Sequence, residues 1–167
     1  NAGGNVAMEK WINNIKGLLY AWYPGQEGGT AIAEILFGEI NPSGKLPVSF
    51  EKKWADNPTY NNYYSNNGNN RVKYNEGVFL GYRYYTSKNV QPRFPFGFGL
   101  SYTTFEYSNL KLVTDTTGGT FTCTATFNIK NTGDFEGAEA AQVYVRDLVS
   151  SVTRPVRELK GFSKITL

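Results

Sequence analysis

Two carboxylates stand in sequence surroundings that suit chemistry, and Glu27 is the first. It lies in WYPGQEGGTAIAEILFG, which runs from Trp22 to Gly38 and leads through two glycines into an apolar helix. A helix N-terminus behind glycines can bind an anion, and a carboxylate at that end also favours the helix dipole. We interpret the stretch as a corner that packs, in which Gln26 and Glu27 satisfy free backbone amides and the glycines allow close backbone approach.

Glu76 is the second candidate, because NEGVF places it beside an aromatic-rich loop and ahead of Tyr82 and Arg83. A glutamate in such a place can act as a general acid. No second carboxylate stands at a suitable spacing on an identifiable facing element, however. We therefore expect Glu76 to form an ion pair with Arg83 that holds this connecting segment.

The absence of histidine removes several kinds of active site. Without histidine there is no Ser-His or Cys-His pair, no HExxH motif and no histidine-containing zinc site. The single cysteine, Cys123, cannot form an internal disulfide, and in the alternating stretch FTCTATFNI it is predicted to be a small buried residue. Any catalysis must therefore use carboxylates, and we expect no cofactor and no metal.

The composition of the chain limits the kinds of partner that it can bind. The chain has 167 residues, enough for one ordinary domain or pieces of two, and its 40% hydrophobic and 19% charged residues are typical of a globular protein. The net charge is +3 with scattered Lys and Arg, so no basic stripe is available for nucleic acid. No apolar run approaches the roughly 20 residues that cross a bilayer. We expect neither nucleic acid nor a membrane as a partner, and any targeting signal outside this sequence.

The first third of the chain has an α/β pattern. Residues 6–11 are short and amphipathic, and residues 17–23 (GLLYAWY) form an apolar run typical of a buried strand. Apolar residues then recur every three or four positions, which predicts a helix capped by Thr30 and ended by Gly38 in a left-handed conformation. KLPVSF at 45–50 is strand-like, so the predicted order is strand, helix, strand.

Residues 51–75 form a long loop rich in Asn, Tyr and Gly, with no apolar period. Loops longer than about 12 to 15 residues are usually functional or flexible, and Tyr with Asn offers stacking faces and amide hydrogen bonds. Two interpretations stay open: a loop that covers its neighbours, or a lid that contacts sugar. The 16% of aromatic residues in the chain suits β-rich structure, and it also suits surfaces that stack on sugar rings.

The second half reads as β structure. Strand propensity returns at 77–85 (GVFLGYRYY), and the Pro, Gly and aromatic residues of 93–112 are typical of a connector between domains. Alternation at 120–129, 140–147 and 159–167 predicts strands, giving about four after the connector. An immunoglobulin-like sandwich needs about seven. We therefore expect an incomplete sandwich and a chain that is the middle of something longer.

Five motifs in order resemble glycoside hydrolase family 3, whose members include β-glucosidases, β-xylosidases and related exo-acting glycosidases. The resemblance covers almost the whole chain, and the Asn-rich loop matches least. The motifs are NAGG at 1–4, WYPGQEGGTAIAEILFGEINPSGKLPVSF at 22–50, YNEGVFLGYRYY at 74–85, FPFGFGLSYTTFEYSNL at 94–110 and VYVRDLVSSVTRPVRELKGFSKITL at 143–167.

The resemblance implies a fold and a division of the chain. The family has an N-terminal (β/α)8-type barrel, a second α/β sandwich domain and, in many members, a fibronectin type III-like sandwich. Residues 1–102 would be the C-terminal part of the α/β sandwich domain with its connector loops, and residues 103–167 the N-terminal part of the fibronectin type III-like domain. The implied fold class is a partial α/β sandwich followed by an incomplete all-β immunoglobulin/fibronectin III-like sandwich.

The resemblance also implies where catalysis takes place. A retaining glycosidase uses two carboxylates about 5 to 5.5 Å apart, a nucleophile and an acid/base. The family nucleophile is an Asp of the barrel, and the acid/base Glu precedes NAGG, so neither has a matching position here. We assign no catalytic, cofactor-binding or metal-binding residue. Charged residues near the C-terminus would instead form structural ion pairs against the second domain; they are Arg146, Asp147, Arg154 and Arg157.

The leading hypothesis is a part of a retaining exo-β-glycosidase, foremost a β-glucosidase, that hydrolyses terminal non-reducing β-D-glycosyl residues of oligosaccharides. This chain would supply scaffold for an enzyme of carbohydrate metabolism. The complete enzyme would bind the oligosaccharide substrate, and the barrel domain of the same enzyme would be the partner of this chain. The alternative is a non-catalytic carbohydrate-binding or domain-docking module. A third possibility is a chain that aggregates on its own through unpaired strand edges. The resemblance implies a secreted or periplasmic location, and a homodimer stays open.

Overall fold

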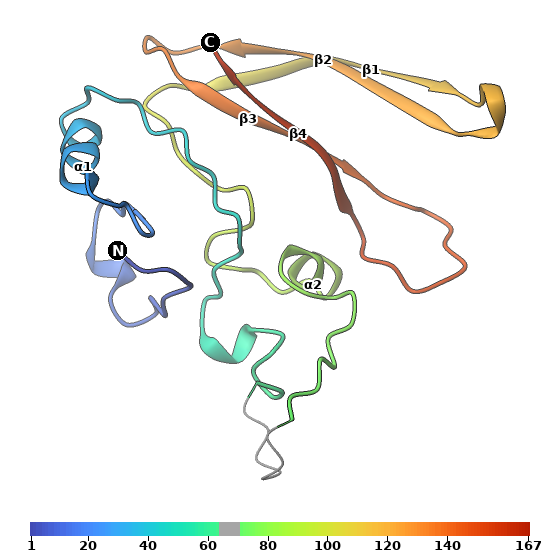
Figure 1. The fold of residues 1–167 in the computed structure, drawn as a ribbon, viewed down its shortest axis with the longest axis horizontal. Coiled ribbons are helices and arrows are strands. Elements are labelled where there is room, and N and C mark those ends of the chain that lie inside the picture. Colours follow the sequence, from blue (N-terminus) through green and yellow to red (C-terminus); the bar gives the residue numbers. More distant parts are fainter. Residues whose placement is uncertain (64–70) are drawn as a thin grey trace.

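The computed structural model of the chain describes residues 1–63 and 71–167. Figure 1 shows two short helices in the first part and two pairs of antiparallel strands in the second. The helices are α1 (Gly28–Leu36) and α2 (Tyr82–Ser87), and the strands are β1 (Phe105–Asp115), β2 (Thr122–Asn131), β3 (Ala138–Val145) and β4 (Glu158–Thr166). Three 3-10 turns lie at Ile12–Asn14, Trp54–Asp56 and Thr117–Gly119.

The helix predicted from the apolar period is α1, and its ends show why it stops where it does. Its N-cap is Glu27, so the prediction of Thr30 as the cap was wrong: Thr30 lies one turn inside the helix. Gly38 has φ +81° and donates its N–H to Ile35 O at 3.1 Å, while Glu39 N donates to Glu34 O at 2.8 Å. This pair of bonds is the Schellman arrangement, and it confirms Gly38 as the left-handed end of the helix.

The strands predicted at 17–23 and 45–50 do not form. Sheet hydrogen bonds need a neighbouring strand. Residues 45–50 instead have an isolated bridge between Phe50 and Phe94 and two backbone hydrogen bonds of Leu46, with Gly97 and Phe98, which do not make a ladder. Trp22 has φ +50°, which breaks the extended conformation of the first segment. The rings of Tyr20, Trp22 and Phe50 join the two segments, and the backbone hydrogen bonds of Leu46 hold the second one as well.

A cluster of aromatic rings around Phe50 forms the centre of the first part. Phe50 is 1% exposed. The Tyr20 ring meets it edge-on with centroids 5.0 Å apart, and the rings of Trp22 and Phe94 each lie 6.4 Å away. Edge-to-face pairs are a favourable geometry for aromatic rings because ring edges are positive and ring faces negative. The cluster therefore joins the two segments that were predicted as strands.

A helix replaces the strand predicted at 77–85. Gly81 has φ +56°, a conformation that favours glycine, and α2 begins immediately after it. Tyr82 packs on Phe96 with ring centroids 5.0 Å apart, and Tyr85 is buried three positions later on the same helix face. Helical spacing thus buries Tyr85 and packs the partly buried Tyr82 on Phe96, so packing overrides their local β propensity.

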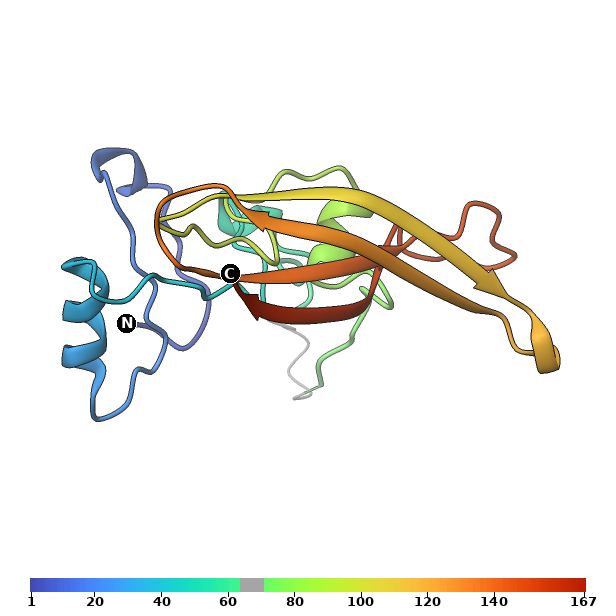
Figure 2. The same ribbon diagram turned by 90° about the horizontal axis from the view of Figure 1, so that it is seen from above.

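The four strands predicted after the connector are confirmed. β1 pairs with β2 from Phe105↔Asn131 to Asp115↔Thr122, and β3 pairs with β4 from Ala138↔Thr166 to Val145↔Glu158. Figure 2 shows the β1–β2 hairpin reaching away from α1, past the end of the β3–β4 pair. Helical and extended segments followed by antiparallel sheets confirm the predicted class, a partial α/β sandwich followed by a β-sandwich.

The hairpin corrects the prediction for Cys123, which is exposed rather than buried. Cys123 pairs with Thr114 near the tip of the hairpin. Most of β1 is exposed there, so alternation along β2 does not turn Cys123 toward a covered face.

None of the described helices is long and apolar enough to cross a membrane.

Candidate functional site

The structure draws attention to the junction, which we define as the contacts between residues 1–102 and residues 103–167. Its first part is centred on Glu139 in β3. Lys45 Nζ lies 3.0 Å from Glu139 Oε2, and the Tyr107 hydroxyl donates to Glu139 Oε1 at 2.9 Å. Lys45 also donates to Gly99 O at 2.8 Å. One carboxylate therefore joins the turn after α1 to both sheets.

The Glu139 cluster has shifted protonation equilibria. Burial by itself would raise the pKa of Glu139, but hydrogen bonds from Lys45 and Tyr107 outweigh it, and the pKa lies below its ordinary value. For Tyr107, burial and the neighbouring Glu139 raise the pKa to about 12. The carboxylate thus stays charged and the phenol stays neutral around neutral pH, which is the state in which their hydrogen bond forms.

Asn41 makes the second part of the junction. Its Nδ2 donates to Glu136 O at 2.9 Å, while its Oδ1 accepts from Ser101 Oγ at 2.9 Å and from Tyr102 N at 2.8 Å. The Tyr102 hydroxyl donates to Ile35 O at 2.6 Å. Asn41 therefore joins the segment after α1 to the connector and to the turn between β2 and β3, and the Tyr102 hydroxyl joins the connector to α1.

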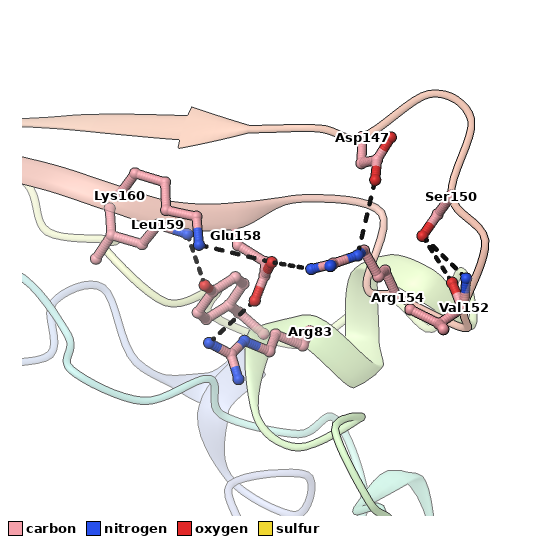
Figure 3. A network of polar contacts seen from close by, with 9 residues as sticks. Arg83, Asp147, Ser150, Val152, Arg154, Glu158, Leu159 and Lys160 are labelled. Carbon is pink, nitrogen blue, oxygen red and sulfur yellow. Dashed lines mark hydrogen bonds and ion pairs between the residues drawn. The ribbon is translucent and has the colours of Figure 1, made fainter. Parts of the chain in front are cut away.

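The third part joins α2 to β4 and is drawn in Figure 3. The Leu159 N–H donates to the Tyr82 hydroxyl at 2.8 Å, and Arg83 Nη2 lies 3.4 Å from Glu158 Oε1. The ring of Tyr82 also meets Tyr144 of β3 edge-on, with centroids 5.7 Å apart. Consecutive residues of α2 thus contact consecutive residues of β4, so the helix fixes the register of this contact.

Arg83 corrects one predicted ion pair, since its partner is Glu158 and not Glu76. Glu76 instead accepts from Asn62 Nδ2 at 3.4 Å, and Asn75 Nδ2 donates to Asn62 Oδ1 at 3.1 Å. These contacts hold together the two arms of the Asn/Tyr-rich loop.

Among the residues that the structure describes, the ion pairs of Asp147 and Arg154 lie within the second half and not against the first, which contradicts the prediction. Arg154 lies 3.7 Å from Asp147 and 3.9 Å from Glu158, and the Arg157 guanidinium lies 5.1 Å from the centre of the Tyr144 ring. Among the described residues, no ion pair includes Arg146. Figure 3 shows Asp147 and Arg154 beside Glu158 and the loop after β3.

The Trp22–Gly38 stretch was predicted to be a corner that packs; it packs at Gly28 but leaves Tyr23, Leu36 and Phe37 exposed. A Cβ on Gly28 would lie 2.7 Å from Pro24 Cγ, so glycine is needed there for close packing. Gly29 has open space around it. The Glu27 side chain makes no capping hydrogen bond to the backbone, contrary to the prediction, although Thr30 Oγ1 lies 3.4 Å from its carboxylate.

The tyrosines of the 51–75 loop are only partly described, because residues 64–70 lie outside the described residues. Tyr60, Tyr63 and Tyr74 are exposed, and Tyr60 meets Trp54 edge-on. Among residues 1–63 and 71–167, no group of three or more His, Cys, Asp or Glu gathers as a metal site would require.

Sequence reasoning missed the residues that make the junction, namely Asn41, Lys45, Tyr82 and Glu139. No local pattern marks them, because each contacts a segment more than 60 residues away. The motif NPSGK at 41–45 contains proline and glycine and so predicts a turn. It marks the segment that carries Asn41 and Lys45, but it does not reveal their partners.

Family models match both halves of the chain. One described as "Glycosyl hydrolase family 3 C-terminal domain" matches residues 1–82, and one described as "Fibronectin type III-like domain" matches residues 139–167. The boundary predicted between residues 102 and 103 lies between these two matches and stays a prediction.

Similar proteins are known for almost the whole chain. It is 50% identical to a probable β-glucosidase I of Aspergillus niger, over 98% of this chain and 20% of that protein. It is 46% identical to thermostable β-glucosidase B of Acetivibrio thermocellus, over 98% of this chain and 22% of that protein. The chain therefore spans about a fifth of the length of these relatives.

The fold matches a solved structure across both halves. The crystal structure of a glycoside hydrolase family 3 β-glucosidase of Bifidobacterium adolescentis aligns with a TM-score of 0.92 and 40% identity, over 99% of this chain and 24% of that chain. Since both family models, the relatives and this structure agree, the chain belongs to glycoside hydrolase family 3.

Proposed function

We propose that the full-length protein is a retaining exo-acting β-glucosidase, and that this chain supplies scaffold and not the catalytic carboxylates. The observation that carries the proposal is the similarity to proteins named β-glucosidases over 98% of the chain. The reaction would release terminal non-reducing β-D-glucosyl residues from oligosaccharides through a covalent intermediate held by two carboxylates. Both carboxylates would come from parts of the protein that precede this chain.

The junction supports the scaffold role. Tyr82, Arg83, Asn41 and Lys45 all contact the second half, so the chain holds two differently folded units in one relative position. The outer surface of α1 carries exposed apolar side chains, Leu36 and Phe37. Large exposed apolar side chains mark surfaces that another part of a protein covers, and the barrel domain would be that part.

The test compares three proteins for hydrolysis of p-nitrophenyl β-glucoside and β-xyloside. They are the full-length protein, the 167-residue chain alone, and thermostable β-glucosidase B of Acetivibrio thermocellus in which this chain replaces the matching segment. We expect turnover by the first and third and none by the second. Turnover by the chain alone would place the catalytic carboxylates within it and contradict the proposal.

Glu76→Gln in the full-length protein provides the matched control. The change keeps the contact with Asn62 possible, because a Gln side chain also carries an acceptor oxygen. We expect turnover to persist. Its complete loss, with folding intact by circular dichroism, would make Glu76 a catalytic residue.

A second candidate is a non-catalytic carbohydrate-binding module, which the exposed Tyr60 and Tyr74 favour. Native gels containing soluble β-glucan test it. A binding module is retarded even when the full-length protein hydrolyses no glucoside, and Tyr60→Ala with Tyr74→Ala would remove that retardation.

The cellular location and the oligomeric state of the full-length protein are further proposals. A secreted or periplasmic location is supported by the family resemblance alone, and fractionation of the native host tests it. A homodimer would appear in light scattering as twice the mass of one full-length polypeptide.

A further inference from the structure

A groove lies where three parts of the chain meet, beside the C-terminal end of α1. It has a volume of about 400 Å³ and is open to solvent, and it is lined by residues 38–41, Ser43, Tyr102, residues 135–138 and Thr166. Figures 1 and 2 both show α1 and the turn between β2 and β3 at the same end of the molecule. Sites for small ligands usually have about 300 to 1,000 Å³, so the groove has room for one.

The walls of the groove are fixed by hydrogen bonds. Asn41 binds Glu136 O on one wall and the backbone N–H of Tyr102 on another. The Tyr102 hydroxyl is held by Ile35 O, so this side chain is anchored at both its backbone and its tip. On the same wall as Glu136, Phe135 O accepts from Asn131 Nδ2 at 2.8 Å, which holds the turn. A ligand would find these groups already in place, which lowers the entropy cost of binding.

Two aromatic side chains of the groove remain accessible. Tyr102 is 45% exposed and Phe135 is 60% exposed. An exposed phenylalanine at the tip of a turn contributes little to the core of its own chain. The electron-rich face of an aromatic ring attracts polarised C–H groups, and a β-glucosyl ring presents such groups on both faces.

The polar groups of the groove fit the rim of the same ligand. Glu39 and Glu136 are exposed and line the groove, and its described lining contains no Lys or Arg. Carboxylate oxygens only accept hydrogen bonds, so they suit the hydroxyl groups of a neutral sugar. They disfavour phosphates and other anions by charge repulsion.

We propose that this groove binds a β-glucan segment, with Phe135 and Tyr102 contacting the sugar faces and Glu39 and Glu136 accepting sugar hydroxyls. The identity of the sugar, a β-glucan, rests on the proposed function. The existence of the site rests on the two aromatic rings, the two carboxylates and the volume between them.

Affinity electrophoresis of the full-length protein in native gels containing hydroxyethyl cellulose tests the site. We expect the wild type to be retarded and Phe135→Ala to bind about three- to tenfold more weakly, which is the effect of losing one aromatic contact. Phe135→Trp, which restores an aromatic face, should recover the retardation. The control is Phe162→Ala, since Phe162 is exposed on β4 and does not line the groove.

Equal retardation of wild type and Phe135→Ala, or no retardation of the wild type, would overturn the inference. Hydrolysis of p-nitrophenyl β-glucoside by the same samples separates it from the proposed function. Retardation that depends on Phe135 in a protein without hydrolysis would uphold the groove and remove the β-glucosidase proposal. Hydrolysis without retardation would uphold the β-glucosidase proposal and remove the groove as a β-glucan site.

Discussion

Lys45 Nζ lies 3.0 Å from Glu139 Oε2, and the two side chains are only 17% and 15% exposed. This ion pair crosses the junction from the turn after α1 to β3. The removal of one partner from a largely buried pair leaves an uncompensated charge, which costs more than the pair itself contributes. The junction should therefore be sensitive to single changes at either end.

Lys45→Met tests this sensitivity. We expect a loss of about 1–3 kcal/mol in the free energy of unfolding of the full-length protein, because Glu139 would keep its charge and lose its cation. Chemical denaturation followed by fluorescence measures it. The control is Lys53→Met, which removes an exposed ion pair with Asp56 and should change stability by less than about 1 kcal/mol. Equal effects of the two variants would contradict a special role for the Lys45–Glu139 pair.

Acid should weaken the same contact. The pKa of Glu139 is lower in the folded protein than its ordinary value of 4.5, so its contribution is fully present above about pH 4.5. That contribution is lost as the pH falls through the lower folded value. The stability difference between wild type and Glu139→Gln should therefore shrink as unfolding is measured at successively lower pH. A difference that stays constant down to strongly acid pH would show that the charge of Glu139 is irrelevant.

Alkali should act through Tyr107, whose pKa is raised from 10.0 to about 12. Because the folded value is the higher one, its contribution is fully present below pH 10 and is lost between pH 10 and 12. In ultraviolet titration, the Tyr107 phenol of Glu139→Ala should therefore ionise at a lower pH than that of the wild type, although burial, the larger cause, still raises its pKa. Identical titration curves would contradict the assigned hydrogen bond.

Local pattern predicted those elements whose stability is local. The 3.6-residue period and Gly38 were enough for α1, and strict alternation was enough for β2. The errors have tertiary causes: α2 is helical because Tyr82 and Tyr85 both find aromatic or buried surroundings there. Cys123 is exposed because the hairpin extends away from the rest of the chain, which alternation along one strand cannot reveal.

The candidate site was harder to predict than the fold. Carboxylates and arginines are readily identified in a sequence as candidates for ion pairs. The partner of Arg83, however, depends on which strand passes beside α2. The same holds for Asn41, whose contacts lie 60 to 95 residues away. Family resemblance supplied the expectation that two units meet in this chain, and the structure supplied the residues that join them.

Tyr82→Phe separates the hydroxyl of the α2 contact from its ring. The ring contacts with Phe96 and Tyr144 remain, but the Leu159 N–H loses its acceptor. A part-buried donor left unsatisfied costs about 1–3 kcal/mol. Arg83→Gln removes a partly exposed ion pair and should cost less than about 1 kcal/mol. Limited proteolysis near residue 159 and the free energy of unfolding both measure the difference, and a larger effect of Arg83→Gln would reverse our order of importance.

Glycine at the two ends of α1 should respond to alanine with opposite signs. Gly38 has φ +81°, where an alanine side chain is strained by about 1–2 kcal/mol, so Gly38→Ala should destabilise the protein. Gly29 lies inside the helix with open space at its Cβ position, so Gly29→Ala should stabilise it by about 0.4–1 kcal/mol. Thermal unfolding of both variants measures the two shifts against wild type. A stabilising Gly38→Ala would mean that the helix does not end in the left-handed turn, and that the wall of the groove that begins there is built differently.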